Sequence, residues 1–222
     1  MSGRFSRDLN VAHVALWIAD QGKALEPQRA EAESFLNCLE KRDACFSFRT
    51  FSDSTYTRFR SQDPLEKALH GSLDSCWEEL VNLNKRGAVV TVTINRTNCI
   101  GRKISDITQV RALFLDDDIG GDPDRFNIPP HMRVETSPNH YHYYWRVDGL
   151  GLRQFQACQQ RLSKIYQGDS RVQALNQSMQ LPGFWRRKQM TVPRLPRVIE
   201  VSEHRPLSYL EIDALLANHG GF

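Results

Sequence analysis

The chain has 222 residues, a length that suits one sizeable domain or one domain with a helical extension. Apolar residues make up 40% of it, enough for a core, and its net charge of +3 is small. No apolar run approaches the roughly 20 residues of a membrane span, and MSGRFSRDLN at the start lacks the apolar stretch of a signal peptide. These features favour a cytoplasmic protein with no membrane partner.

The five cysteines are odd in number, and no two of them have the two-residue gap of a zinc or redox motif. A disulfide framework and a zinc ribbon are therefore not expected. The sequence predicts reduced, mostly buried thiols instead.

The N-terminal half alternates helices and strands. Helices are expected over 11–20, from near Pro27 onward, and over Leu73–Arg86, and strands over Cys45–Phe51 and Ala88–Ile94. The last strand is rich in β-branched residues, and Gly87 ends the helix before it.

The C-terminal half continues this mixture. Strands are expected over Arg111–Leu115, Met132–Thr136, Tyr141–Val147 and Val198–Val201, and helices over Leu152–Tyr166 and from Ser208 to a stop at Gly220. The Ser137–His140 connection reads as a hairpin, which implies antiparallel pairing. We therefore predict an α+β fold, with a sheet backed by helices.

Three consecutive aspartates end the apolar Arg111–Leu115 run. Alternate residues of a strand point to the same face, so Asp116 and Asp118 are expected side by side, with Asp117 opposite unless the strand ends there. Neighbouring carboxylates repel unless a cation lies between them, and their oxygens suit Mg²⁺ or Mn²⁺. The alternative is a solvated acidic turn, since DDDIGGDPD also contains two glycines.

Histidines and aromatic residues alternate after the hairpin. His140, His142 and Tyr144 share one face of the strand, and the tyrosines and Trp145 share the other. A histidine beside a metal-bound triphosphate can donate to a phosphate or accept a proton, and Ser137 with its turn amides can bind phosphate. We predict that the aromatic face packs in the core and that His142 is the functional histidine.

The stretch Leu181–Arg205 is basic. It holds six Lys or Arg residues against two glutamates: Arg186, Arg187, Lys188, Arg194, Arg197 and Arg205 against Glu200 and Glu203. Such a surface attracts phosphates, although a merely solvated stretch would look the same.

The order of these motifs resembles the RepB-type primases of plasmids and phages, within the archaeo-eukaryotic primase superfamily. The resemblance rests on Leu113–Asp118, on Glu135–Pro138 through Tyr141-His142, on Tyr166–Asp169, and on Leu181–Phe184 with Lys188. Weaker matches lie upstream, so that it covers most of Arg29 to Val201.

The resemblance implies an RNA-recognition-like antiparallel or mixed sheet flanked by helices, with a second small α/β unit. We predict one primase-like catalytic domain over 1–222, with a helical extension at 1–44 and a C-terminal helix at 207–219, although the first 25 residues and the last helix carry little of the resemblance. The resemblance also implies template-directed primer synthesis from nucleoside triphosphates on single-stranded DNA, for which we expect two-metal nucleotidyl transfer with Mg²⁺ or Mn²⁺. A chain this short would need a helicase or initiator as partner to replicate an element.

By position, the resemblance assigns the metal carboxylates to Asp169 and two of Asp116, Asp117 and Asp118, and His142 to the incoming triphosphate. It assigns nucleotide or nucleic-acid contacts to Ser137, Asn139, His140, Arg186, Arg187 and Lys188. Which aspartate pairs with Asp116 stays open. The sequence departs from the family pattern at Ala174, Gln177 and Gln180, where relatives often carry an acidic residue and arginines.

Two other functions fit parts of the sequence. A nicking replication initiator would use His140 and His142 on one metal and Tyr166 as nucleophile, although this leaves the aspartates unexplained. A catalytically weak primase-like protein would only bind an origin or single-stranded DNA.

Overall fold

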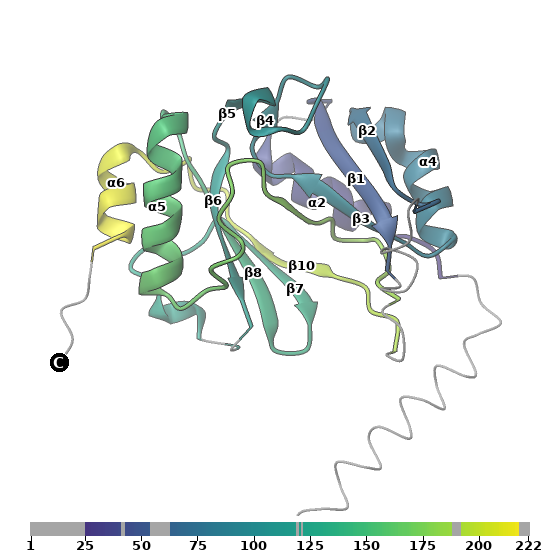
Figure 1. Cartoon of the computed structure of the whole chain (residues 1–222). Helices are drawn as coiled ribbons and strands as arrows, with labels where there is room; N and C mark the ends of the chain where they lie inside the picture. Colours follow the sequence, from purple (N-terminus) through teal and green to yellow (C-terminus); the bar gives the residue numbers. More distant parts are fainter. Residues whose placement is uncertain are drawn as a thin grey trace, which may run out of the picture.

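In the computed structural model, two four-stranded sheets stand side by side, each flanked by helices (Figure 1). The structure describes residues 25–40, 43–53, 63–118, 120, 122–187 and 192–217. The predicted α+β class is confirmed. The helix expected over 11–20 and the stop at Gly220 lie outside the described residues. None of the described helices is long and apolar enough to cross a membrane.

The first sheet has the order β2-β1-β3-β9, with every pair antiparallel. Its strands are β1 (Phe46–Ser52), β2 (Lys67–Gly71), β3 (Ala88–Thr93) and β9 (Ser178–Gln180). Helix α4 (Leu73–Lys85) packs against β3 and buries Leu80 and Leu83 completely. Its N-cap is Ser72, whose hydroxyl accepts from the Ser75 N–H and so supplies one of the partners that a helix start lacks.

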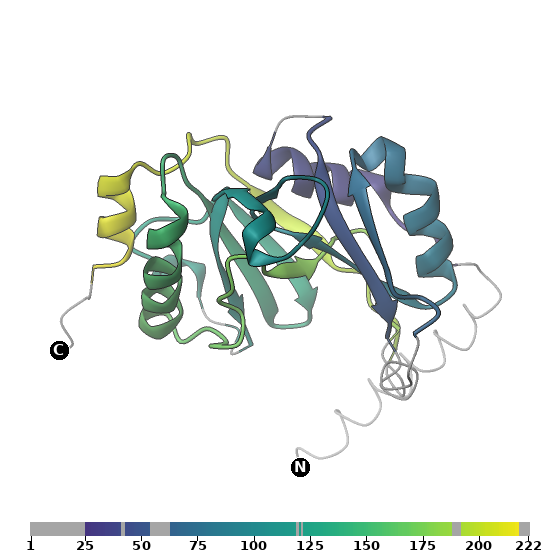
Figure 2. The same ribbon diagram turned by 45° about the horizontal axis from the view of Figure 1, so that its top comes forward.

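The second sheet has the order β10-β7-β8-β6 and is also antiparallel throughout. Its strands are β6 (Ala112–Asp117), β7 (Met132–Ser137), β8 (His140–Arg146) and β10 (Arg197–Val201). Helices α5 (Leu152–Ile165) and α6 (Tyr209–Leu215) lie on the side of this sheet away from α4 (Figures 1 and 2).

Strand β6 is an edge strand, and a side chain of α5 forms hydrogen bonds with the backbone of its free edge. The Gln159 amide is fully buried, accepts a hydrogen bond from the Phe114 N–H at 3.2 Å and donates to the Phe114 carbonyl. Gln159 therefore takes the place of a neighbouring strand for Phe114, and it fixes α5 against the strand that carries the aspartates.

Helix α2 (Arg29–Leu39) joins the two sheets. Its Phe35 ring meets Tyr144 of β8 edge-on, with 5.2 Å between ring centroids. Its Glu31 carboxylate accepts from the Val198 N–H of β10, and just before the helix the Gln28 N–H donates to the Gly183 carbonyl. One apolar core runs through both sheets as a result.

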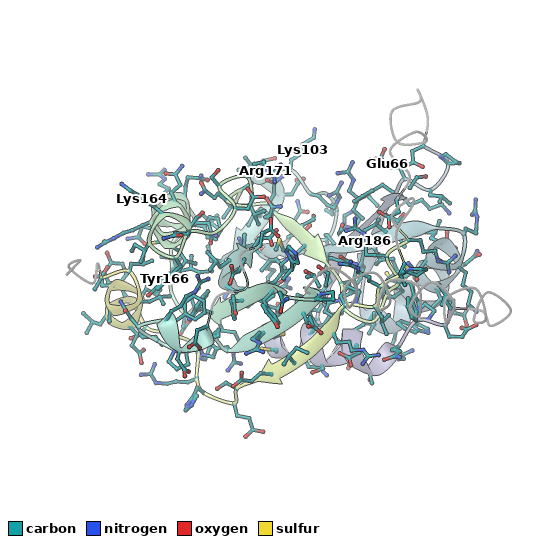
Figure 3. The ribbon with its side chains drawn as sticks, turned by 90° about the horizontal axis from the view of Figure 1, so that it is seen from below. Glu66, Lys103, Lys164, Tyr166, Arg171 and Arg186 are labelled. Atoms are coloured by element: carbon teal, nitrogen blue, oxygen red, sulfur yellow. A yellow bond between two sulfur atoms is a disulfide. The ribbon has the colours of Figure 1, made fainter. Side chains whose placement is uncertain are left out.

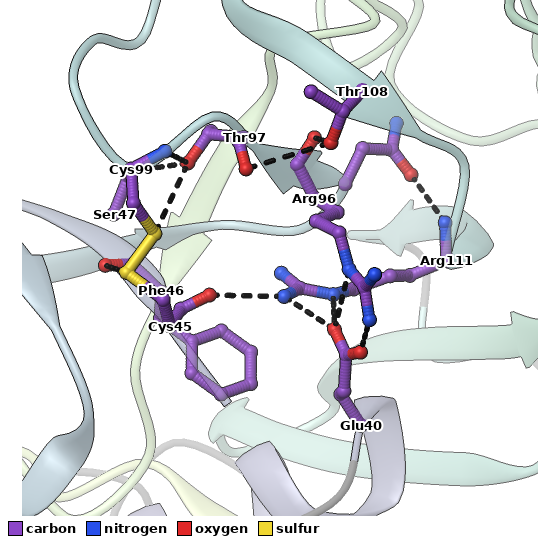
Figure 4. A network of polar contacts seen from close by, with 10 residues as sticks. Glu40, Cys45, Phe46, Ser47, Arg96, Thr97, Cys99, Thr108 and Arg111 are labelled. Carbon is purple, nitrogen blue, oxygen red and sulfur yellow. Dashed lines mark hydrogen bonds and ion pairs between the residues drawn. A yellow bond between two sulfur atoms is a disulfide. The ribbon is translucent and has the colours of Figure 1, made fainter. Parts of the chain in front are cut away.

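The prediction of reduced thiols is wrong for two of the five cysteines, because Cys45 and Cys99 form a disulfide (Figure 4). Cys38, Cys76 and Cys158 are free. Cys45 comes just before β1, and Cys99 lies in the connection between the short paired strands β4 (Arg96–Thr97) and β5 (Ile107–Gln109). These cysteines are 54 residues apart in the sequence, so their disulfide could not be predicted from a local spacing motif.

A buried ion pair lies beside that disulfide. The Arg111 guanidinium contacts the Glu40 carboxylate at the end of α2, donates to the Cys45 carbonyl at 3.1 Å and stacks over the Phe46 ring (Figure 4). Arg96 also pairs with Glu40. Because Arg111 immediately precedes β6, this network links the start of β6 to the first sheet and to α2.

Several expected boundaries differ in the structure. Strand β6 continues through Asp116 and Asp117 instead of ending at Leu115, and helix α6 covers Tyr209–Leu215 rather than 207–219. Strands β2 and β9 were not predicted, because Lys67–Gly71 and Ser178–Gln180 are short and carry few of the β-branched and aromatic residues that mark strands.

Candidate active site

Asp116 and His142 are direct cross-strand partners on β6 and β8. His142 Nε2 lies 3.4 Å from Asp116 Oδ1, and His142 Nδ1 lies 3.3 Å from the Tyr144 hydroxyl. Burial, together with the charge of Asp116, raises the pKa of Tyr144 well above its usual value, so the phenol stays protonated and can donate to Nδ1. In the tautomer that accepts from Tyr144 at Nδ1, the ring N–H is at Nε2, which faces Asp116.

A second carboxylate–imidazole pair lies at the end of the same face. Asp118 Oδ1 is 3.1 Å from His140 Nδ1, and both side chains are exposed to solvent. The hairpin holds His140 there: Ser137 pairs with it across the turn, and Asn139 adopts a positive φ of 62°. Asn139 also packs against Gly120, where a Cβ would come within 2.8 Å of the Asn139 carbonyl oxygen.

Asp169 reaches this face from the loop after α5. Its N–H donates to the Asp116 carbonyl at 3.0 Å. The preceding Gly168 makes this approach possible, since a Cβ there would lie 2.3 Å from Leu115 Cδ1. Residues Asp116, Asp118 and Asp169, the acidic group of this face, thus lie near one end of β6.

Arg171 is the cationic partner of Asp169 in this acidic group. Its Nε and Nη2 donate to both Asp169 carboxylate oxygens at 2.8–3.0 Å, although its side chain is 85% exposed. These hydrogen bonds lower the pKa of Asp169, and Asp169, followed by Asp118 and Asp116, raises the pKa of Arg171. Arg171 therefore lies within electrostatic reach of all three carboxylates.

Asp117 lies on the opposite face of β6 and is completely buried. Its carboxylate accepts from Arg125 Nη2 at 2.8 Å. Of the two candidate partners of Asp116, strand geometry therefore puts Asp118 on the same face and Asp117 in an ion pair behind the sheet.

The chemistry of the acidic group suits a divalent metal. Hard cations bind carboxylate oxygens, and each carboxylate here already faces a cationic or imidazole partner in the place of an ion. Within the described ranges, no three His, Cys, Asp or Glu side chains are already gathered closely enough to hold a metal ion. Asp169 would have to exchange Arg171 for the metal.

Of the three predicted basic contacts, Arg186 and Arg187 lie within the described residues, and both contact Asp53. Arg186 pairs with the buried Asp53 and contacts Gln180 at the edge of the first sheet. Arg187 donates to the Lys85 carbonyl at the end of α4, where a cation also complements the helix dipole. Lys188 lies outside the described residues. Figure 3 shows Arg186 and Arg171 from below.

Tyr166 is not placed to act as a nucleophile. It is 5% exposed, its hydroxyl donates to the Leu215 carbonyl at 2.9 Å, and burial raises its pKa. Its ring packs on Phe126, which also contacts Tyr143, a residue of the β8 face opposite to His142. The two histidines also pair with different carboxylates, so the nicking-initiator arrangement is not formed.

Sequence reasoning missed two residues of the site. Arg171 follows Asp169 by two residues, a spacing at which a side chain can return to its neighbour's carboxylate, and that spacing was the available signal. Tyr144 shares the His142 face by strand alternation, but only the fold shows its contact with Nδ1.

Comparison with known proteins identifies a family and a fold for the chain. The RepB DNA-primase N-terminal domain family matches residues 87–213. No curated protein matches the chain. The AEP domain of the cyanophage S-2L primase-polymerase superposes with a TM-score of 0.70 at 16% identity, over 86% of this chain and 100% of that one.

Two structures of primase RepB′ also share the fold. One superposes with a TM-score of 0.59 at 16% identity, over 84% of this chain and 60% of that one. The catalytic domain of RepB′, in complex with initiator DNA, superposes with a TM-score of 0.55 at 18% identity, over 84% and 92%. Since the family match spans more than half of the sequence, the chain belongs to the RepB DNA-primase N-terminal domain family.

Proposed function

We propose that the protein is a DNA-dependent primase, a nucleotidyltransferase that makes short primers on single-stranded DNA for the replication of a plasmid or phage-like element. The observation that carries the proposal is the convergence of Asp116, Asp118 and Asp169 beside His142 on one side of β6 and β8. The DNA-bound RepB′ domain of the same fold supports a DNA template.

Asp116, Asp118 and Asp169 would hold Mg²⁺ or Mn²⁺. The bound metal would supply Lewis-acid stabilisation of the triphosphate charge and a lower pKa for the attacking 3′ hydroxyl. His142, whose Nε2 lies on the Asp116 side, would donate a hydrogen bond from this nitrogen to a phosphate oxygen. His140, Ser137 and Asn139 would bind the nucleotide at the rim of the site.

We also propose a cellular location, substrates and a partner for the protein. We place this single catalytic domain in the cytoplasm, with nucleoside triphosphates as substrates. A replicative helicase or initiator would be its partner. Lys188 and Arg186 would contact phosphate or template, whereas Arg187 is proposed to hold the segment against α4.

The test is primer synthesis on single-stranded DNA with Mg²⁺ or Mn²⁺ and labelled nucleotides. Asp116→Asn and Asp169→Asn should abolish short products, while Asp213→Asn, the same charge change on the exposed side of α6, should not. Full synthesis by either site variant would refute the assignment. DNA binding without any incorporation by the unmodified protein would point to the binding-only alternative.

A further inference from the structure

The face of the first sheet opposite the apolar core carries a polar row across three strands. Arg49 of β1 pairs with Thr91 of β3, which pairs with Gln180 of β9. The adjacent row, Phe48, Val92 and Met179, is buried in the core, so strand alternation turns the polar row to the other face. The row spans about 10 Å, two strand spacings.

Gln180 presents a fixed hydrogen-bond donor in this row. Arg186 Nη1 donates to Gln180 Oε1 at 3.3 Å, which forces the amide nitrogen to point elsewhere. Gln180 is 9% exposed, and its Nε2 is buried without a hydrogen-bond partner among the described residues. A buried donor in this state is costly unless a ligand accepts from it.

Arg49, at the other end of the row, resembles Gln180 in having one satisfied polar group and one buried donor that is not satisfied. Its outer Nη2 donates to Glu66 at 2.7 Å, but its Nε is a buried donor without a partner within the described ranges. Arg102 is anchored beside the start of β9, because its carbonyl accepts from Asn176 Nδ2 at 2.9 Å. Burial lowers the pKa of Arg102 most, the charge of Arg49 lowers it further, and the charge of Glu66 raises it, so the two guanidinium groups share a single nearby carboxylate.

The charges of this surface leave a positive excess. Arg49, Arg102 and Arg186 contribute three positive charges, and the carboxylates that pair with them are Glu66 and Asp53. Seen from below in Figure 3, Arg186 lies near the middle of the molecule, and Glu66 and Arg171 lie toward the upper edge of the view.

We propose that Arg49, Arg102 and Gln180, with Arg186 fixing the amide, form a binding site for a phosphate group. Phosphate suits it because its several acceptor oxygens match the fork of an arginine and a neighbouring amide donor. The proposal deepens the proposed primase function and rests on it, since that function supplies two sources of phosphate: a nucleoside triphosphate and the backbone of single-stranded DNA.

The site is tested by equilibrium binding in EDTA, where the carboxylates of the catalytic face hold no metal. Inorganic tripolyphosphate is one probe, followed by calorimetry, and a fluorescent oligothymidylate without a 5′ phosphate is the other, followed by anisotropy. Gln180→Glu keeps the acceptor for Arg186 and replaces the free donor by a carboxylate oxygen. Arg102→Gln removes one guanidinium.

Each variant has a control with the same charge change. Gln177→Glu lies just before β9, and Arg153→Gln lies on the exposed side of α5. Circular dichroism and thermal melting check that all four variants fold. Loss of one charge-assisted hydrogen bond should weaken binding about tenfold or more.

Loss of tripolyphosphate binding alone identifies a triphosphate site, loss of oligothymidylate binding alone identifies a template site, and loss of both identifies a phosphate site open to each. If folded Gln180→Glu and Arg102→Gln bind both probes as their controls do, the site does not exist. That failure is separate from failure of the primase proposal, because Asp116→Asn should lose synthesis while it keeps phosphate binding in EDTA.

Discussion

Asp116 and His142 face each other across neighbouring strands, with 3.4 Å between Asp116 Oδ1 and His142 Nε2. The register of β6 against β8 therefore fixes the position of the carboxylate relative to the imidazole. We expect His142→Gln to lower kcat/KM for nucleotide incorporation by about 100-fold, the lower end of the range for a positioned proton donor. Steady-state incorporation kinetics measure this, with His204→Gln as the exposed control. Unchanged kinetics would remove His142 from the mechanism.

Replacement of Asp117 should affect stability rather than chemistry. Asp117→Ala leaves the partly buried Arg125 without its carboxylate, which should cost about 3 kcal/mol and lower Tm by roughly 6–12 °C. The exposed Asp118→Ala should change the free energy of unfolding by less than about 0.5 kcal/mol. Denaturant unfolding and calorimetry test the pair, and a stable Asp117→Ala protein without synthesis would place Asp117 in the site after all.

Gln159→Leu should loosen the β6 edge. The change leaves the Phe114 N–H and carbonyl without their side-chain partner in a buried place, at a cost of at least about 2 kcal/mol. Gln160→Leu, on the exposed side of the same helix, is the matched control. Amide hydrogen exchange should show faster exchange at Phe114 in the first variant alone; equal exchange in both would mean that the edge does not depend on Gln159.

Arg171 should compete with metal for Asp169. Arg171→Gln removes the hydrogen bonds that lower the pKa of Asp169, so that pKa should rise toward its ordinary value. A lowered folded-state pKa stabilises the protein above the unfolded-state pKa, and that contribution disappears as pH falls through the folded-state value; the variant should therefore lose less stability on acidification.

The same variant should bind Mn²⁺ up to about fivefold more tightly, as expected when an exposed ion pair no longer competes. Electron paramagnetic resonance of free Mn²⁺ gives the affinity, and carbon NMR of the carboxylates gives the pKa. Arg161→Gln, on α5, is the control. Weaker Mn²⁺ binding by Arg171→Gln would show that Arg171 supports the metal site instead.

Tyr166→Phe should leave primer synthesis within about twofold of the unmodified protein. The hydroxyl bonds the Leu215 carbonyl and the Asn127 N–H, so its loss should cost about 1–3 kcal/mol of stability. Synthesis assays and thermal melting separate the two effects. A covalent DNA adduct that disappears in this variant would revive the nicking alternative.

Local patterns predicted the parts of the site that lie on regular strands. The two-residue period of a strand placed Asp116 with Asp118 and His140 with His142. It could not show how far β6 continues, and therefore left the role of Asp117 open. The ion-pair partner of Asp117 is Arg125, the last residue of a short 3-10 helix (Pro123–Arg125) that carries no periodic signal.

The positions of the other residues depend on contacts between segments that are far apart in the sequence. Gln159 reads as one more polar residue of an amphipathic helix until the edge of β6 is known to lie beside it, 45 residues away. Gln177 and Gln180 stood out only as departures from the family pattern. The fold gives Gln180 a place beside Arg186, and β1 and β3 align Arg49 with it.

Strand β9 has a consequence for how the chain can fold during translation. The first sheet begins at Phe46, but its fourth strand is not made until Gln180 leaves the ribosome, and β10 completes the second sheet later still. Neither sheet can close on a nascent chain that stops before those residues. A fragment limited to 87–213, the span of the family match, would keep β3 and β9 but lack β1, so β3 would lose its partner on one side. The useful unit for expression therefore starts before α2.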